Sequence, residues 1–206
     1  MRKIIYIIMA AVVLGSATGA IARGPAPQAA LPVPFVVPAV SQPEPKPELY
    51  FTVGEMPDWI KCLPAPPDSG SIDYARDVMR YFQGKQARRD SARMAVATLD
   101  AAWSFDTLFF QFSQPFGLLI TREGTPEIYK LLLNGIATIE QSRLAPKSHY
   151  GRRRPFEVTG EHMYTQFEES NLRGEGSYPS GHTIRGWSCA LILAEVNPEA
   201  ATALYE

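Results

Sequence analysis

Two short segments of the sequence carry residues that could bind a phosphate group and cleave its ester. The first is basic and runs from Lys147 to Arg154, with Pro155 next. The second reads Pro-Ser-Gly-His at 179–182 and leads directly into an apolar stretch with helical periodicity. A phosphoryl group in transfer carries negative charge on its non-bridging oxygens, and Lys, Arg and the backbone N–H groups of a helix start neutralise that charge. Together the two segments indicate a phosphate site.

Each segment alone also has an ordinary structural explanation. A run of charged residues is most often a solvated loop, and Pro-Ser-Gly is common turn chemistry in front of a helix. A lone histidine at 182 would more often be structural than catalytic. The presence of both segments together favours a functional site over these structural explanations. A given tetrapeptide rarely occurs by chance in a chain of this length, and the basic segment lies only a short distance upstream.

The two segments resemble the first two motifs of the bacterial class A non-specific acid phosphatases, within the type 2 phosphatidic acid phosphatase superfamily. The first family motif is Lys, six residues, then Arg-Pro, as in Lys147 and Arg154-Pro155. The second is Pro-Ser-Gly-His, which here lies within Gly-Ser-Tyr-Pro-Ser-Gly-His-Thr at 176–183. The resemblance extends from about Leu63 to the last residue. It implies an all-α helical bundle that needs no cofactor or metal and hydrolyses phosphate monoesters broadly through a phosphohistidine intermediate.

The resemblance also implies a role for each matched residue. Lys147 and Arg154 would bind the non-bridging phosphate oxygens. Ser180 and Gly181 would supply a hydroxyl and backbone donors at the helix start, where the helix dipole favours an anion. His182 would protonate the leaving alcohol, a task that suits an imidazole because its pKa lies near the working pH.

Residues around the motifs are expected to play supporting parts. Arg152 and His149 lie in the same loop as the first motif and are not expected to be catalytic. Arg153 is expected to face solvent. Tyr178 and Trp187 are expected to be packing residues.

The third motif of the family is absent from the sequence. It reads Ser-Arg, five residues, His, three residues, Asp; the resemblance makes its His the nucleophile, its Asp the partner of that His, and its Arg a phosphate clamp. None of the three histidines, at 149, 162 and 182, fits the pattern. A helix-opening pattern, Asn-Pro-Glu at 197–199, also begins shortly before the last residue. We therefore expect a truncated part of a longer enzyme, without its C-terminal helices and with little turnover alone; the alternative is a complete chain that has lost its nucleophile.

Three other functions stay open at this point. A chain that keeps the phosphate cradle without the nucleophile would be a non-catalytic phosphate or polyanion binder. The vanadium-dependent haloperoxidases resemble the same active site with vanadate in place of phosphate, although the short chain and the sequence around the second motif favour the phosphatase. Within the phosphatases, a nucleoside di- or triphosphate hydrolase and a phosphotransferase are open.

Helices are expected to position these residues. Ser71 is expected to cap a helix with apolar residues at 74, 78, 81 and 82, and a second helix is expected at 91–103. Thr125-Pro126-Glu127 is typical of a helix opening, with a capping hydroxyl and an early proline. The second motif should open a helix from about His182 to Val196. Its expected core contacts are Trp187, Ala190, Leu191 and Leu193.

The N-terminal part is expected to direct export. Residues 1–22 have the features of a secretory signal peptide, with Arg2 and Lys3 before an apolar stretch and Ala-Ile-Ala at 20–22 as a cleavage site. We expect a periplasmic protein; the alternative is an uncleaved anchor, which would be its one contact with a membrane. The proline-rich residues 23–48 are expected to form a linker, and residues 49–206 the domain.

The composition and net charge limit the classes of partner to be expected. A formal net charge of −1 argues against a nucleic-acid binder, so small phosphorylated substrates are the expected partners. A homo-oligomer is left open. Cys62 and Cys189 could form a disulfide in an oxidising compartment; alternatively, Cys189 is a buried small residue of an apolar helix.

Overall fold

The computed structural model describes residues 43–206, and every regular element within this range is a helix. The expected signal peptide and most of the expected linker lie outside the described residues. The all-α fold class is confirmed. No helix of residues 43–206 combines the length and the apolar character that crossing a membrane requires.

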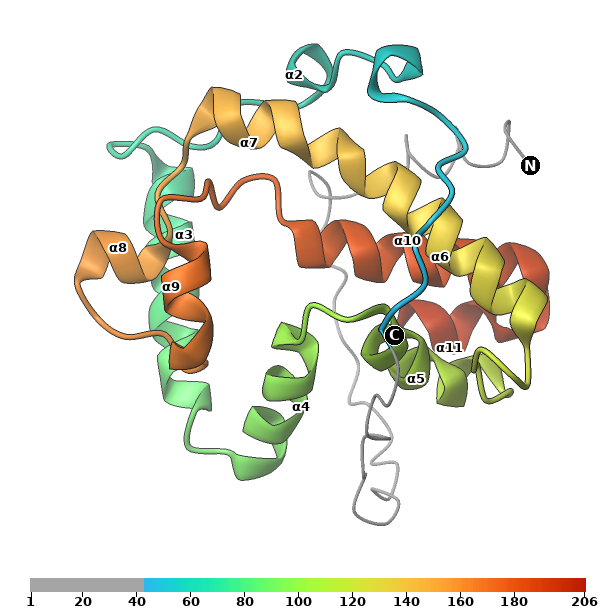
Figure 1. The fold of residues 1–206 in the computed structure, drawn as a ribbon. Helices are drawn as coiled ribbons and strands as arrows, with labels where there is room; N and C mark the ends of the chain where they lie inside the picture. Colours follow the sequence, from blue (N-terminus) through green and yellow to red (C-terminus); the bar gives the residue numbers. More distant parts are fainter. Residues whose placement is uncertain (1–42) are drawn as a thin grey trace.

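The helices follow one another with short connections (Figure 1). In chain order they are η1 (Val53–Glu55), α2 (Trp59–Cys62), α3 (Ile72–Ala87), α4 (Ser91–Ala101), α5 (Phe105–Phe116), α6 (Pro126–Glu140), η2 (Gln141–Arg143), α7 (Leu144–Tyr150), α8 (Pro155–Thr159), η3 (Gln166–Glu168), α9 (Glu169–Leu172), α10 (Gly181–Val196), η4 (Pro198–Ala200) and α11 (Ala201–Tyr205).

The hydrophobic core lies where α6 packs along α10, with α5 and α11 beside them (Figure 1). Leu132 and Ile136 of α6, Phe109 of α5 and Leu193 of α10 are fully buried there. Gly135 lets the two long helices approach closely, because a Cβ at this position would lie 2.9 Å from the Cδ1 atom of Ile192. The core therefore anchors α10, the helix that the second motif opens.

Residues 43–48, the end of the expected linker, lie against the helices. The carboxylate of Glu44 accepts hydrogen bonds from the Ser104 hydroxyl and from the Phe105 N–H at the start of α5, both at 2.7 Å. The Glu48 N–H donates to the side-chain oxygen of Asn134 in α6 at 2.9 Å.

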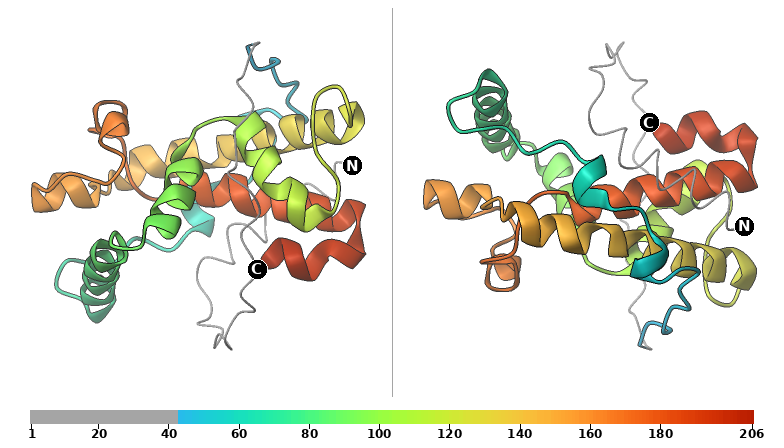
Figure 2. Two further views of the ribbon diagram at one scale, coloured as in Figure 1. Left: turned by 90° about the horizontal axis from the view of Figure 1, so that it is seen from below. Right: turned by 90° about the horizontal axis from the view of Figure 1, so that it is seen from above.

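Helix α3 forms as predicted, but its apolar residues are not core. The Ser71 hydroxyl caps the helix by accepting from the Tyr74 N–H at 3.1 Å. However, α3 contributes no buried residue, and Phe82 is 54% exposed. The reason is position: α3 gathers with α8 and α9 at one end of the molecule, away from the α6–α10 core (Figures 1 and 2). Polar contacts hold it, including the ion pair between Lys85 and Glu161 at 2.7 Å.

Two details of the other predicted helices differ from expectation. Helix α6 begins at Pro126 as predicted, but the Thr125 hydroxyl does not cap it; this hydroxyl closes the preceding turn by bonding the backbone of Thr121. In α10 the prediction that Trp187 is a core contact is wrong. Its side chain is 44% exposed, and its ring centroid lies 6.0 Å from that of Tyr205.

The two cysteines are not joined. Cys62 is exposed at the end of α2, whereas Cys189 is fully buried in α10. Burial raises the pKa of the Cys189 thiol. The disulfide alternative is therefore wrong for this structure, and Cys189 is a core residue of an apolar helix.

Candidate functional site

All five residues predicted for the phosphate site line one cavity of about 620 Å³, called here the central cavity. It lies where α4, α7, α9 and the start of α10 face one another (Figure 1). Its lining residues are Ala97, Asp100, Ala101, Trp103, Arg143, Lys147, Arg154, Met163, Thr165, Glu168, Asn171, Leu172, Glu175, Ser177, Ser180, Gly181 and His182.

Short helices and tight backbone contacts bring the two motifs together. Lys147 lies in α7, which ends at Gly151 in a left-handed conformation with φ of 52°. Arg154 stands directly before α8, and Ser180 directly before α10. Ser177 then joins the segments, because its N–H donates to the carbonyl oxygen of Arg152 at 2.7 Å. The charged side chains of the first motif are thereby held opposite the start of α10.

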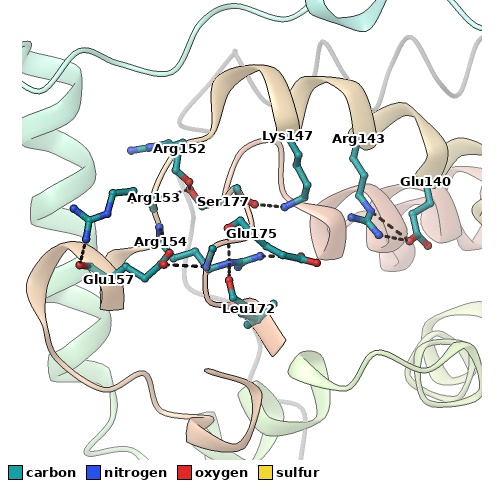
Figure 3. A network of polar contacts seen from close by, with 12 residues as sticks. Glu140, Arg143, Lys147, Arg152, Arg153, Arg154, Glu157, Leu172, Glu175 and Ser177 are labelled. Carbon is teal, nitrogen blue, oxygen red and sulfur yellow. Dashed lines mark hydrogen bonds and ion pairs between the residues drawn. The ribbon is translucent and has the colours of Figure 1, made fainter. Parts of the chain in front are cut away.

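The Lys147 ammonium points across the gap between the motifs and donates a hydrogen bond to the Gly176 carbonyl oxygen (Figure 3). Partial burial, together with the positive charges of Arg154 and Arg143, lowers the pKa of Lys147 to about 8, and the charge of Glu175 opposes them. An anion in the cavity would relieve both effects, since it would compensate the buried charge. Within residues 43–206, no carboxylate forms an ion pair with Lys147.

Arg154 is held by backbone oxygens of the segment that leads to the second motif. Its Nε donates to the carbonyl oxygens of Leu172 and Glu175, each at 3.1 Å (Figure 3). The Glu175 carboxylate lies 3.8 Å from Nη2, a long and partly solvated ion pair. Burial lowers the pKa of Arg154, against the opposing effect of Glu175. The fork of the guanidinium thus keeps donors for a ligand.

Ser180 and Gly181 form the start of α10. The Ser180 hydroxyl accepts from the Thr183 N–H at 3.2 Å, so its own proton stays available to a ligand. Neighbouring side chains leave no room for a side chain at Gly181, because a Cβ there would lie 2.9 Å from the Trp103 ring and 3.3 Å from Cδ of Arg143. Helix α10 has 16 residues, and its first two, Gly181 and His182, line the cavity, so the start of the helix, where backbone N–H groups lack intrahelical partners, adjoins it.

His182 lies on the first turn of α10 against the ring of Trp103. The ring centroids are 4.8 Å apart at 77°, an edge-to-face arrangement, and Nε2 lies 3.3 Å from the Ala101 carbonyl oxygen. Burial lowers the pKa of His182, and the charges of Arg185 and Arg154 act in the same direction, whereas the Ala101 carbonyl opposes them. In the absence of an anion, the neutral imidazole is favoured near neutral pH.

A cluster of side chains beneath the helix start was not predicted from the sequence. Arg185 is buried and stacks over Trp103, with its guanidinium carbon 3.5 Å from the ring centroid. Its Nε donates to Glu140 at 2.8 Å, and Arg143 donates to the same carboxylate at 2.9 Å. Arg143 could have been found, because it lies four residues before Lys147 and therefore on the same helical face. Nothing in the sequence linked Trp103 to the site.

Of the residues around the motifs, Arg153 and Tyr178 lie as expected, whereas the side chains of Arg152 and His149 do not reach the cavity that they were expected to support. Arg153 is exposed, and its guanidinium returns to the Glu157 carbonyl oxygen at 2.6 Å. Arg152 turns from the cavity toward α3, where it pairs with Asp77 at 2.6 Å. His149 is exposed and does not line the cavity. Tyr178 is a packing residue whose hydroxyl donates to the Pro64 carbonyl oxygen at 2.9 Å.

Comparison with known proteins points the same way as the motifs. The chain is 38% identical over 156 residues to a non-specific acid phosphatase of Providencia stuartii, a match that covers 75% of the chain and 62% of that protein. It is 36% identical over 144 residues to a non-specific acid phosphatase of Salmonella typhimurium, covering 69% and 57%. With an acid phosphatase of Zymomonas mobilis it shares 33% over 144 residues, covering 70% and 54%.

The chain is a homologue of proteins named acid phosphatase. It spans between 54% and 62% of the length of these relatives. No protein-family model matches the chain.

Proposed function

We propose that the central cavity binds the phosphate group of small phosphate monoesters, and that the chain is part of an exported acid phosphatase of broad specificity. The observation that carries this proposal is the convergence of Lys147, Arg154, Ser180, Gly181 and His182 on one cavity. The names of the homologues support it, since each is called an acid phosphatase. Two cations and a helix start supply the positive charge, so the proposal requires no metal ion.

In this proposal each group acts on a defined part of the substrate. Lys147 and Arg154 neutralise the non-bridging oxygens, and the N–H groups at the start of α10 donate to them. In the longer parent, a nucleophilic histidine that is not among the three of this chain forms a bond to phosphorus as the bond from phosphorus to the ester oxygen breaks. Protonated His182 gives its proton to that oxygen, so the phosphoryl group passes to the nucleophile and an alcohol leaves. Because burial lowers the pKa of His182, the protonated form is populated on the acidic side. Phosphate transfer by this route therefore favours acid pH.

A phosphohistidine intermediate needs a second histidine on the opposite side of the phosphorus atom. The other two histidines of the chain do not line the central cavity. His149 lies beside the ring of Tyr150, and His162 pairs with the Glu169 carboxylate at 3.0 Å. We therefore propose that the intermediate forms only in a longer parent protein, and that the 206-residue chain has little turnover alone.

The same observation favours one alternative, a module that binds phosphate or a polyanion without hydrolysis. It keeps the cations and the helix start and needs no nucleophile. The two proposals share a binding site and differ in whether a longer gene product supplies the missing histidine.

The test is turnover of p-nitrophenyl phosphate at acid pH by the 206-residue chain, together with binding of inorganic phosphate by calorimetry. We expect binding that a chelator does not alter, and turnover no greater than that of the His182→Ala variant. Acid-labile phosphate on a histidine of this chain would contradict the proposed lack of turnover. Absence of phosphate binding would contradict both proposals.

A further inference from the structure

Glu140, Arg143 and Arg185 form a charged cluster below the start of α10. Glu140 is 8% exposed and accepts from both guanidinium groups, through Oε1 from Arg143 and through Oε2 from Arg185. The two arginines therefore share one carboxylate, and the charge of Glu44 also acts on Arg185. Arg143, whose one ion pair among residues 43–206 is with this shared carboxylate, is the incompletely compensated cation. Buried unpaired charge is costly, so an uncompensated cation beside a cavity indicates that an anion completes the cluster.

The two arginines of the cluster are not equivalent. Arg185 is enclosed, because the rings of Trp103 and Phe105 lie 3.5 and 4.3 Å from its guanidinium carbon, and it does not line the central cavity. Arg143 does line the cavity. Its Nε and Nη2 point to Glu140, whereas Nη1 makes no hydrogen bond within residues 43–206. Arg143 is therefore the member of the cluster with a donor left for a ligand.

Arg143 also lies beside the position that a phosphate at the start of α10 would occupy. Its Nε is 3.4 Å from the position that a Cβ on Gly181 would take, so the guanidinium flanks the first residue of the helix. Arg143 and Lys147 extend from the same side of the continuous η2–α7 segment (Figure 3). An anion held by Lys147 and the α10 start is thus within reach of Arg143.

We propose that Arg143 is a third phosphate-binding cation of the central cavity, with its guanidinium positioned by Glu140. The inference rests on the proposed function, since it names a further ligand of the same phosphate. Glu140 fixes the plane of the fork while Nη1 faces the anion, the arrangement in which arginine recognises phosphate oxygens. Arg185 and Trp103 hold Glu140 and the helix start in place from below.

The first test is calorimetric titration of the 206-residue chain with inorganic phosphate. Loss of one charge-assisted hydrogen bond should weaken binding by roughly 10- to 100-fold in Arg143→Gln. Arg143→Lys keeps the charge without the fork and should give a smaller loss. Arg153→Gln is the matched control, because it removes an equal charge from an exposed position outside the cavity. Circular dichroism melting establishes that each variant is folded.

The outcomes separate this inference from the proposed function. If the wild-type chain and Arg143→Gln bind phosphate equally well, the inference is wrong and the phosphate site stands. If the wild-type chain binds no phosphate, both are wrong. An equal loss in Arg153→Gln would show a general charge effect and would also overturn the inference.

A second measurement on the wild-type chain decides the matter if Arg143→Gln does not fold. Hydrogen exchange at the arginine side chains, followed by NMR, reports on each guanidinium separately. Saturating phosphate should slow exchange at Arg143 and Arg154 and leave Arg153 unchanged. Protection of Arg154 with no change at Arg143 would overturn the inference.

Discussion

Ser177 donates both its backbone N–H and its hydroxyl to the carbonyl oxygen of Arg152, at 2.7 and 3.0 Å. This pair of bonds joins the two motifs, which are separated by some two dozen residues of sequence. The hydroxyl also reaches the Arg153 carbonyl oxygen at 3.2 Å. The geometry of the phosphate site therefore depends on a residue that contributes no charge to it.

Replacing Ser177 should loosen the site without unfolding the protein. Ser177→Ala keeps the N–H bond and loses the hydroxyl bonds, so we expect a loss of about 0.5–1.5 kcal/mol in the free energy of unfolding. Phosphate affinity should fall with it, because Arg154 follows the joined segment. Urea unfolding and calorimetry measure the two effects. The control is Ser170→Ala, at an exposed position of α9; an equal loss there would contradict the account.

Gly176 should tolerate no side chain. A Cβ at this position would lie 2.6 Å from the carbonyl oxygen of Lys147, which is a backbone atom and cannot turn aside. Gly176→Ala should therefore separate α7 from the second motif, with a cost of about 1–3 kcal/mol in stability and a loss of phosphate binding. The measurement is thermal unfolding with and without phosphate.

Gly186→Ala is the matched control for that change. Gly186 lies inside α10, and a Cβ there meets no atom within 4 Å. Because alanine is the better helix former, we expect this variant to be more stable by about 0.5–1 kcal/mol. A stable Gly176→Ala variant with normal phosphate binding would show that the close approach at Lys147 is unimportant.

The pH dependence of phosphate binding should report the ionisation of the Lys147 side chain. Its pKa is about 8 in the free chain, so the ammonium is charged below this value and neutral above it. Binding should weaken as the pH rises beyond about 8, where inorganic phosphate itself no longer changes charge appreciably. In Lys147→Arg the cation stays charged, so its affinity should stay flat from pH 7.5 to pH 10 by calorimetry. An identical decline in both proteins would assign the effect to another group.

Glu140 should matter for stability as well as for the site. Arg185 is 7% exposed and pairs with Glu140 at 2.8 Å. Glu140→Gln leaves this buried guanidinium without a carboxylate, which should cost about 3–5 kcal/mol in urea unfolding. Asp73→Asn removes an exposed partner of Arg76 and should cost at most about 1 kcal/mol. Similar losses in the two variants would contradict the role assigned to the cluster.

The sequence predicted the parts of this site that are local and missed those that depend on packing. Helix α10 is encoded locally, so the sequence around the second motif was enough to predict it from about His182 to Val196, within one residue of its observed bounds; the Ser180 cap was not predicted. The exposure of Phe82 and Trp187 could not be read from periodicity, because an apolar face does not say which neighbour will cover it. Trp103 lies far from both motifs in sequence, and only tertiary packing places its ring against His182.

The central claim is that phosphate lies at the start of α10 between Lys147 and Arg154. Titrating the ¹⁵N-labelled chain with inorganic phosphate, and following each N–H by NMR, tests it directly. The account predicts saturable shifts at the Gly181 and His182 amides and at Nε of Arg154, with one shared dissociation constant. Saturable shifts confined to other residues, or none at these three groups, would contradict it.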